Sequence, residues 1–136
     1  MRSTSGSSPT SERGACECRN SIPWRGGARA RAVLIVACDG DKIIGPRFIR
    51  LLDEIDARGS IRAAAASLGV GYRHALDWIT RAELLVRQPL VERHAGGAAG
   101  GGARLTGKAR RVSRAYRRLN SSIFRLVQHA EGELLG

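Results

Sequence analysis

One stretch near the middle of the chain, GSIRAAAASLGVGYRHALDWI from Gly59 to Ile79, limits the possible folds more than any other. Its first part carries Ile61 and a run of alanines at helical spacing, so a second helix can approach it closely. Gly69 ends that part, and the apolar spacing of a helix resumes after Gly71. Two helices joined by a glycine-containing turn of about three residues form a helix-turn-helix.

The second helix of this unit begins with polar residues. In a DNA-bound helix-turn-helix, the N-terminal end of the second helix meets base edges in the major groove. From this unit we expect DNA contacts by Ser60, Arg62, Gly71, Tyr72, Arg73, His74 and Asp77. Asp77 lies one helical turn after Arg73 and is expected to orient it. The alternative interpretation is an ordinary helical hairpin that only packs a core.

A second segment, PLVERHAGGAAGGGARLT from Pro89 to Thr106, places five glycines within seven positions. Glycine is costly inside regular structure, so this cluster marks a loop that turns sharply or lies close to another molecule. The residues on either side predict two short strands, and the segment is therefore expected to form a wing. We expect Arg93, His94 and Arg104 at its shoulders to contact backbone phosphates.

Two other interpretations of the glycine segment remain. The first is a flexible linker, although the apolar residues at both ends do not favour it. The second is a nucleotide-binding P-loop, because GARLTGKA matches the first seven positions of that motif. Ala109 stands where a Ser or Thr would ligate magnesium, which argues against a P-loop.

The segments before the helix-turn-helix predict a hairpin and a helix. RAVLIVACDGDKIIGP has two apolar runs around Asp-Gly-Asp, the strongest short hairpin signal in the chain. RFIRLLDEIDAR has apolar residues on one helical face. Residues 1–31 are rich in Ser, Gly and Arg and predict a disordered basic tail. The expected domain covers 32–136, with the helix-turn-helix at about 60–86, the wing at about 89–106 and a C-terminal helix at about 107–130.

Apolar or small residues recur along the C-terminal helix at alternating spacings of three and four. This spacing is typical of a coiled-coil seam, so we expect a homodimer. The residues expected to form the dimer are Val112, Tyr116, Leu119, Ile123 and Leu126. The expected fold class is mainly α with small β elements.

Basic residues outnumber acidic ones, with 23 Lys+Arg against 12 Asp+Glu and a formal net charge of +11. Such an excess suits a polyanion such as nucleic acid or an anionic membrane surface. The longest apolar run, AVLIVAC, is far shorter than the ~18 residues of a spanning helix and predicts a buried strand. We expect double-stranded DNA as partner, no membrane association, and a cytoplasmic, nucleoid-associated location.

The chain shows no arrangement typical of catalysis or metal binding. Its cysteines, Cys16, Cys18 and Cys38, lack the spacing of a structural zinc site and are expected to be reduced thiols. Its three histidines stand in unrelated segments, and no nucleophile with a matching base stands out. We expect no catalytic residue, no metal, no cofactor and no enzymatic activity.

Three motifs, RFIRLLDEID, GSIRAAAASLGVGYRHAL and PLVERHAGGAAGGGARLT, together resemble the N-terminal DNA-binding domain of ModE-type, molybdate-responsive transcription regulators, which is related to LysR-type winged helices. The resemblance covers about Val33 to Leu126. It implies a winged helix-turn-helix with an N-terminal strand pair and a C-terminal helix that helps to form a homodimer. It further implies a sequence-specific transcriptional regulator linked to molybdate-related genes.

The chain departs from that family in several places. Gly71 stands where a Ser is usual, and Leu76 stands where a Trp is usual, while Trp78 follows two residues later. The two small β-barrel domains that bind molybdate have no counterpart in this sequence, so molybdate sensing is not carried over. Two alternatives stay open: a protein-interaction module derived from the same fold, and a nucleoid-type protein that binds DNA without sequence preference.

Overall fold

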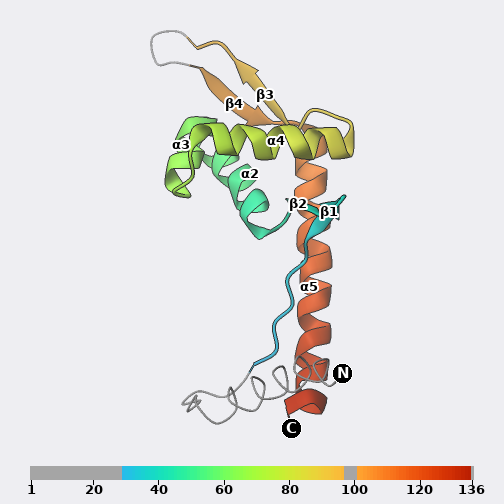
Figure 1. The fold of residues 1–136 in the computed structure, drawn as a ribbon. Coiled ribbons are helices and arrows are strands. Elements are labelled where there is room, and N and C mark those ends of the chain that lie inside the picture. The colour runs from blue at the N-terminus through green and yellow to red at the C-terminus, as the bar shows by residue number, and fades with distance from the viewer. Residues whose placement is uncertain (1–28, 97–100, 136) are drawn as a thin grey trace, which may run out of the picture.

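The computed structural model describes residues 29–96 and 101–135 (Figure 1). All but the last three residues of the expected N-terminal tail lie outside the described residues, as does the centre of the glycine loop. The described elements, in chain order, are β1 (Val36–Cys38), β2 (Asp41–Ile44), α2 (Pro46–Arg58), α3 (Ile61–Ser67), α4 (Tyr72–Val86), β3 (Val91–His94), β4 (Gly102–Leu105) and α5 (Gly107–Leu135). The expected fold class, mainly α with small β elements, is confirmed.

The expected N-terminal hairpin is present as the antiparallel pair β1 and β2. Asp39 and Gly40 in its turn have φ values of 52° and 86°, the left-handed region that two-residue hairpin turns require. The expectation of a buried strand over AVLIVAC is wrong. Strand β1 starts only at Val36 and is exposed, and Val33 before it is 56% exposed, because no described element covers that side of the two-stranded sheet.

Helix α2 carries the largest part of the core. Pro46 occupies its first turn, and Gly59 ends it in the left-handed conformation with a φ of 67°. Its apolar face is buried, and Leu51, Leu52 and Ile55 are 0% exposed. Burying one such side chain fully stabilises the fold by about 1.5–3 kcal/mol. This helix therefore anchors the elements around it, which are α3, α5, β2 and β4.

Helices α3 and α4 form the expected helix-turn-helix. Ser60 caps α3 by accepting a hydrogen bond from the backbone N–H of Ala63 at 3.2 Å. Gly69 in the turn has a φ of 68°, which explains the glycine there. Ala65 and Ala75, both almost fully buried, allow the two helices to pack closely.

A polar link ties α2 to α3. The side chain of Arg58 and the hydroxyl of Ser67 both donate hydrogen bonds to the Glu54 carboxylate. These two hydrogen bonds hold the pKa of Glu54 below its usual value. The link lies on the outside of the helix pair and fixes how α3 sits against α2.

The wing consists of β3 and β4, paired antiparallel with His94 opposite Gly102. It is joined to the end of α2, because the N–H of Ala103 in β4 donates to the Gly59 carbonyl at 2.8 Å. Leu90, just before β3, is 0% exposed and joins the core. Figure 1 shows the hairpin projecting beyond α3 and α4 on the side away from α5.

The two halves of α5 have different surroundings. In the first half, Ala109, Ser113 and Tyr116 are buried against the domain, and the Tyr116 hydroxyl donates to the Leu34 carbonyl at 2.9 Å. Arg110 forms a two-pronged ion pair with Asp56 at 3.0 and 3.2 Å. The helix then continues past the β1–β2 hairpin, away from α2 and the wing (Figure 1).

The expected dimer seam needs a correction for this reason. Tyr116 belongs to the core of its own domain, and Val112 is half-buried against the same core. Beyond them, Leu119 and Leu126 are 56% and 69% exposed. Only Leu119, Ile123 and Leu126 of the expected seam lie on the part of α5 that is free to meet a partner. Apolar residues at spacings of three and four are expected both for a helix that packs within its own chain and for one that packs against a second chain. The spacing alone therefore does not distinguish the two.

The Tyr116 hydroxyl provides a test of how α5 is held. Replacing Tyr116 with Phe removes the hydrogen bond to Leu34 and should lower the free energy of unfolding by about 0.5–1.5 kcal/mol at neutral pH. Burial raises the pKa of Tyr116 above its ordinary value. The unfolded chain therefore ionises first as the pH rises, and wild-type stability should begin to fall near pH ~10.

Urea denaturation at pH ~7 and pH ~10.5 measures both effects. The Phe variant should lack the part of the alkaline loss that Tyr116 causes. Equal stability of the two proteins at pH ~7 would contradict the assigned hydrogen bond.

Candidate nucleic-acid interface

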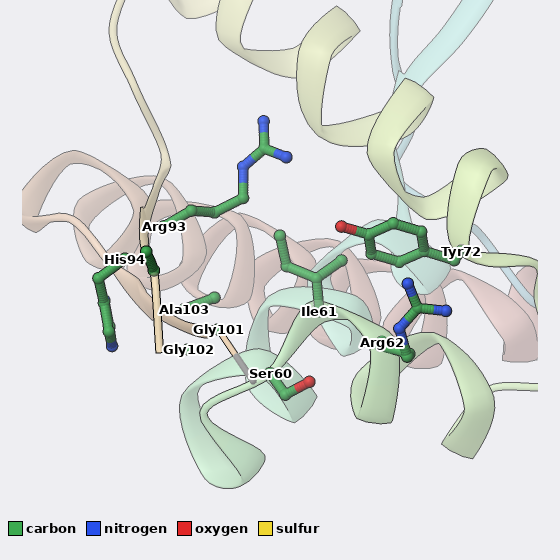
Figure 2. A pocket seen from close by; sticks show the side chains of 10 residues that line it. Ser60, Ile61, Arg62, Tyr72, Arg93, His94, Gly101, Gly102 and Ala103 are labelled. Atoms are coloured by element: carbon green, nitrogen blue, oxygen red, sulfur yellow. The ribbon is translucent and has the colours of Figure 1, made fainter. Parts of the chain in front are cut away.

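Half of the expected DNA-contacting residues come together where α3, the start of α4 and the wing meet. These elements surround an open hollow of about 450 Å³ (Figure 2). Of the residues expected to contact DNA, those that line the hollow are Ser60, Arg62, Tyr72, Arg93 and His94. Those that lie outside it are Gly71, Arg73, His74, Asp77 and Arg104. The structure thus divides the expected set into two groups.

On the helix side of the hollow, Arg62 and Tyr72 are stacked. The guanidinium carbon of Arg62 lies 4.3 Å from the centre of the Tyr72 ring, a distance typical of a cation–π contact. Figure 2 shows the guanidinium beneath the ring and the Tyr72 hydroxyl pointing across Ile61 toward the wing. This contact joins the first turn of α3 to the first turn of α4.

On the wing side, Arg93 and His94 point in different directions. Figure 2 shows Arg93 projecting from β3 toward the hollow and His94 turned away from the other side chains. The His94 ring lies over Gly102, where a Cβ atom would overlap Nε2 of the imidazole. A larger residue at position 102 would require the exposed His94 side chain to move aside. Arg93 forms no ion pair within residues 29–96 and 101–135.

Arg104 is paired across the wing. Its Nε donates to Oε2 of Glu92 at 2.9 Å, and the two residues stand directly opposite each other in the β3–β4 register. Both side chains are more than half exposed, so the pair contributes little to stability. The carboxylate does offset the positive charge of Arg104 toward a phosphate.

Helix α4 presents Arg73 and His74 to solvent at its first turn. Its N-terminal residue, Gly71, forms no side-chain cap, as expected from the missing Ser. The His74 ring meets Trp78 edge to face at 4.9 Å, and the Arg47 guanidinium lies 5.5 Å from the Trp78 ring centre. Trp78 thus holds His74 in place, a role that its position in the sequence did not indicate.

The expected pair of Asp77 with Arg73 is not formed. Asp77 instead accepts from Nε of Arg81 at 2.9 Å, and Arg81 also donates to Asp41 of β2 at 3.2 Å. An acidic residue four positions before a basic one is the favourable order on a helix, and Arg81 gains a second carboxylate there. Arg73 consequently has no ion pair within the part of the chain that the structure describes.

Two side chains fix the base of the wing, and one of them, Glu83, was missed by the sequence reasoning. Glu83 on α4 accepts hydrogen bonds from the backbone N–H groups of Leu90 at 2.8 Å and Val91 at 3.2 Å. Thr106 donates from its hydroxyl to the Pro89 carbonyl at 2.8 Å, and the same oxygen caps α5. No local pattern marks a glutamate that accepts hydrogen bonds from a strand start seven residues away, whereas a threonine directly before a helix is a common capping residue.

Within residues 29–96 and 101–135, no three His, Cys, Asp or Glu side chains come together as a metal site. In the same residues, no helix is long and apolar enough to cross a bilayer. The arrangement that the structure does offer is a surface of unpaired guanidinium groups beside an exposed helix start. Such groups recognise phosphates and guanine edges.

Glu83 gives a direct test of how the wing is positioned. Replacing Glu83 with Ala leaves two partly buried N–H groups without an acceptor and should lower the free energy of unfolding by about 1–3 kcal/mol. Replacing it with Gln keeps an acceptor oxygen at the same place and should cost clearly less. Chemical denaturation of the two variants compares them, and equal losses would rule out the assigned hydrogen bonds.

No protein-family model matches the chain. The chain is nevertheless similar to curated proteins, among them the molybdenum transport protein ModE of Azotobacter vinelandii, with 45% identity over 71 residues, which is 52% of this chain and 26% of that protein. The DNA-binding transcriptional dual regulator ModE of Escherichia coli (strain K12) is 42% identical over 71 residues, 52% of this chain and 27% of that protein.

Among solved structures, ArgP from Mycobacterium tuberculosis aligns with a TM-score of 0.41 and 26% sequence identity, over 68% of this chain and 31% of that chain. The chain spans about a quarter of the length of the two ModE proteins. Over about half of this chain, the resemblance to ModE-type transcription regulators is thereby confirmed.

Proposed function

We propose that this chain is a sequence-specific DNA-binding transcriptional regulator without enzymatic activity. The observation that carries the proposal is the exposed first turn of α4, with Arg73 and His74 in solvent, inside a helix-turn-helix whose wing lies beside it. In such units the start of the second helix enters the major groove. The relatives named as transcriptional regulators support the same function.

The two groups of residues would have different tasks on DNA. Arg73 on α4 forms no ion pair with any residue that the structure describes, and a guanidinium in the major groove bonds bidentately to guanine. The residues around the hollow lie between the helices and the wing, where the sugar-phosphate backbone borders the groove. Base reading is therefore assigned to Arg73 and His74, and backbone contact to the hollow and the wing.

We also infer which genes the protein regulates and where in the cell it acts. A link to molybdate-related genes is supported by the names of its relatives, one of which is a molybdenum transport protein. We further infer that the chain binds DNA without a cofactor, and that it acts in the cytoplasm, at the nucleoid.

Replacing Arg73 with Ala tests the assignment of α4 as the reading helix. The variant should bind the duplex that the wild type prefers with a loss of about 1–3 kcal/mol, and should bind a scrambled duplex almost as the wild type does. Arg104→Ala serves as the comparison, since removing a phosphate-binding group from the wing weakens binding to both duplexes alike.

Fluorescence anisotropy titrations of both duplexes supply the measurement. A loss of affinity for the scrambled duplex as large as that for the preferred one would show that Arg73 does not read bases. It would also favour a nucleoid-type protein without sequence preference.

We also propose that the chain forms a homodimer through the outer part of α5. Leu119 and Leu126 are largely exposed, Ile123 is half-buried, and the three follow the four-three spacing of a two-helix seam. An exposed apolar stripe of this kind on a helix that extends from its domain requires a cover. A two-fold axis along α5 would present two copies of α4 to DNA.

A double variant, Leu119→Asp with Ile123→Asp, tests the dimer. Two carboxylates in the seam should convert the dimer to a monomer, because an uncompensated charge is costly to bury. Ser121→Asp adds one such charge at an exposed position of the same helix and should leave the dimer intact. Sedimentation velocity reports the mass, and an unchanged dimer in the double variant would refute the seam.

A further inference from the structure

The geometry points to a specific use of the hollow between α3 and the wing: it is a seat for one backbone phosphate of DNA. Two guanidinium groups, of Arg62 and Arg93, would hold the phosphate. Tyr72 would serve as the platform that positions Arg62, and it would not read a base. The inference rests on the proposed function, and it names the ligand group and the role of each side chain at that site.

The stack of Arg62 on Tyr72 is the first observation. The guanidinium carbon lies 4.3 Å from the ring centre, while the Arg62 side chain forms no ion pair within the described residues. An arginine that stacks on an aromatic face keeps the N–H groups along its edge free. Arg62 is thus ordered without a carboxylate, and its donors remain available to an anion from outside.

The second observation is the charge of the hollow. Arg93 projects into it from the wing, opposite the Arg62–Tyr72 stack (Figure 2). None of the residues that line the hollow is acidic. Ile61 on its floor is 4% exposed and offers no polar group that would satisfy the two cations. A doubly cationic hollow with an apolar floor favours a compact anion that accepts several hydrogen bonds, as a phosphate does.

The position of the hollow favours a backbone phosphate over a base as its occupant. The wing approaches with Gly101 and Gly102, which carry no side chain of their own, and the His94 ring lies over Gly102. Arg73 and His74, on the exposed turn of α4, lie outside the hollow and remain free for base edges. When α4 lies in the major groove, the first helix of the unit, which is α3, crosses the sugar-phosphate backbone, so the backbone passes beside the hollow.

The same geometry argues against a contact between Tyr72 and a DNA base. One face of its ring is covered by Arg62, and its hydroxyl points toward the wing across Ile61 (Figure 2). The hydroxyl adds a neutral donor to the seat, weaker than the two charged groups. The main role of the ring is to hold the Arg62 guanidinium flat.

A phosphate-neutralisation scan tests the seat on the full chain. Single phosphates of the preferred duplex are replaced in turn by uncharged methylphosphonates, and affinity is measured for wild type and Arg62→Ala. In the wild type, one replacement on the strand facing the wing should weaken binding about tenfold. Arg62→Ala should itself bind any duplex about tenfold more weakly and should lower the salt slope by about one. In this variant, the same phosphate replacement should have no further effect on affinity.

Three further variants separate positioning from charge. Tyr72→Phe keeps the ring and should retain most of the sensitivity to that phosphate, while Tyr72→Leu should lose it as Arg62→Ala does. Arg62→Lys keeps the charge without the planar stack and should lose most of the sensitivity. Arg87→Asn, at the far end of α4 in a left-handed conformation that Asn accepts, removes one charge and should leave the sensitivity unchanged.

The outcomes distinguish this inference from the proposed function. Wild-type protein that binds no duplex overturns the proposed function. Wild-type protein that prefers one sequence, while Arg62→Ala stays equally sensitive to every phosphate replacement, overturns the seat and leaves the function standing. Tyr72→Leu behaving as Tyr72→Phe, with both variants folded by circular dichroism, overturns the platform role.

Discussion

The buried face of α2 is the constraint on which the rest of this structure depends. Leu51, Leu52 and Ile55 are fully buried, and the helix that carries them packs against α3, α5, β2 and β4. One helix therefore holds the helix-turn-helix, the wing and the long C-terminal helix in fixed relative positions. The hydrogen bond between Ala103 and Gly59 joins the wing to the end of the same helix. A DNA-contacting surface assembled from three elements needs such a common anchor, because displacements of about an ångström already weaken recognition.

The arginines of the described chain fall into two groups by what they contact. Several of them bind acidic side chains within the fold, as Arg110 does with Asp56 and Arg81 does with Asp77 and Asp41. Others lie beside the helix start and the wing without an acidic partner in the described residues, as Arg62, Arg73 and Arg93 do. Net charge alone could not make this separation, since every arginine counts equally in a sum. We propose the second group for the DNA interface, because its donors are still available to a polyanion.

Sequence reasoning succeeded where a local pattern determines the structure and failed where a distant contact decides it. Gly69 identified the turn of the helix-turn-helix because turn chemistry acts over three or four residues. The expected pairing of Asp77 with Arg73 was wrong. Asp77 pairs with Arg81, which is also held by Asp41, thirty-six residues before Asp77. The predicted dimer seam included Tyr116, because Tyr116 has the spacing of a dimer residue. Its hydroxyl instead donates to the Leu34 carbonyl within the same chain. The Arg62–Tyr72 stack joins two helices across a turn, and no periodicity reports such a contact.

The central claim is that α4 reads DNA sequence in a two-fold arrangement. Selection of bound duplexes from a random pool tests this claim most directly, because every possible target site competes in the same experiment. We predict enrichment of one motif with two inverted half-sites, about one helical turn apart from centre to centre, as two copies of α4 on one face of DNA require. Recovery of sequences no different from the starting pool, from protein that binds DNA, would contradict the account.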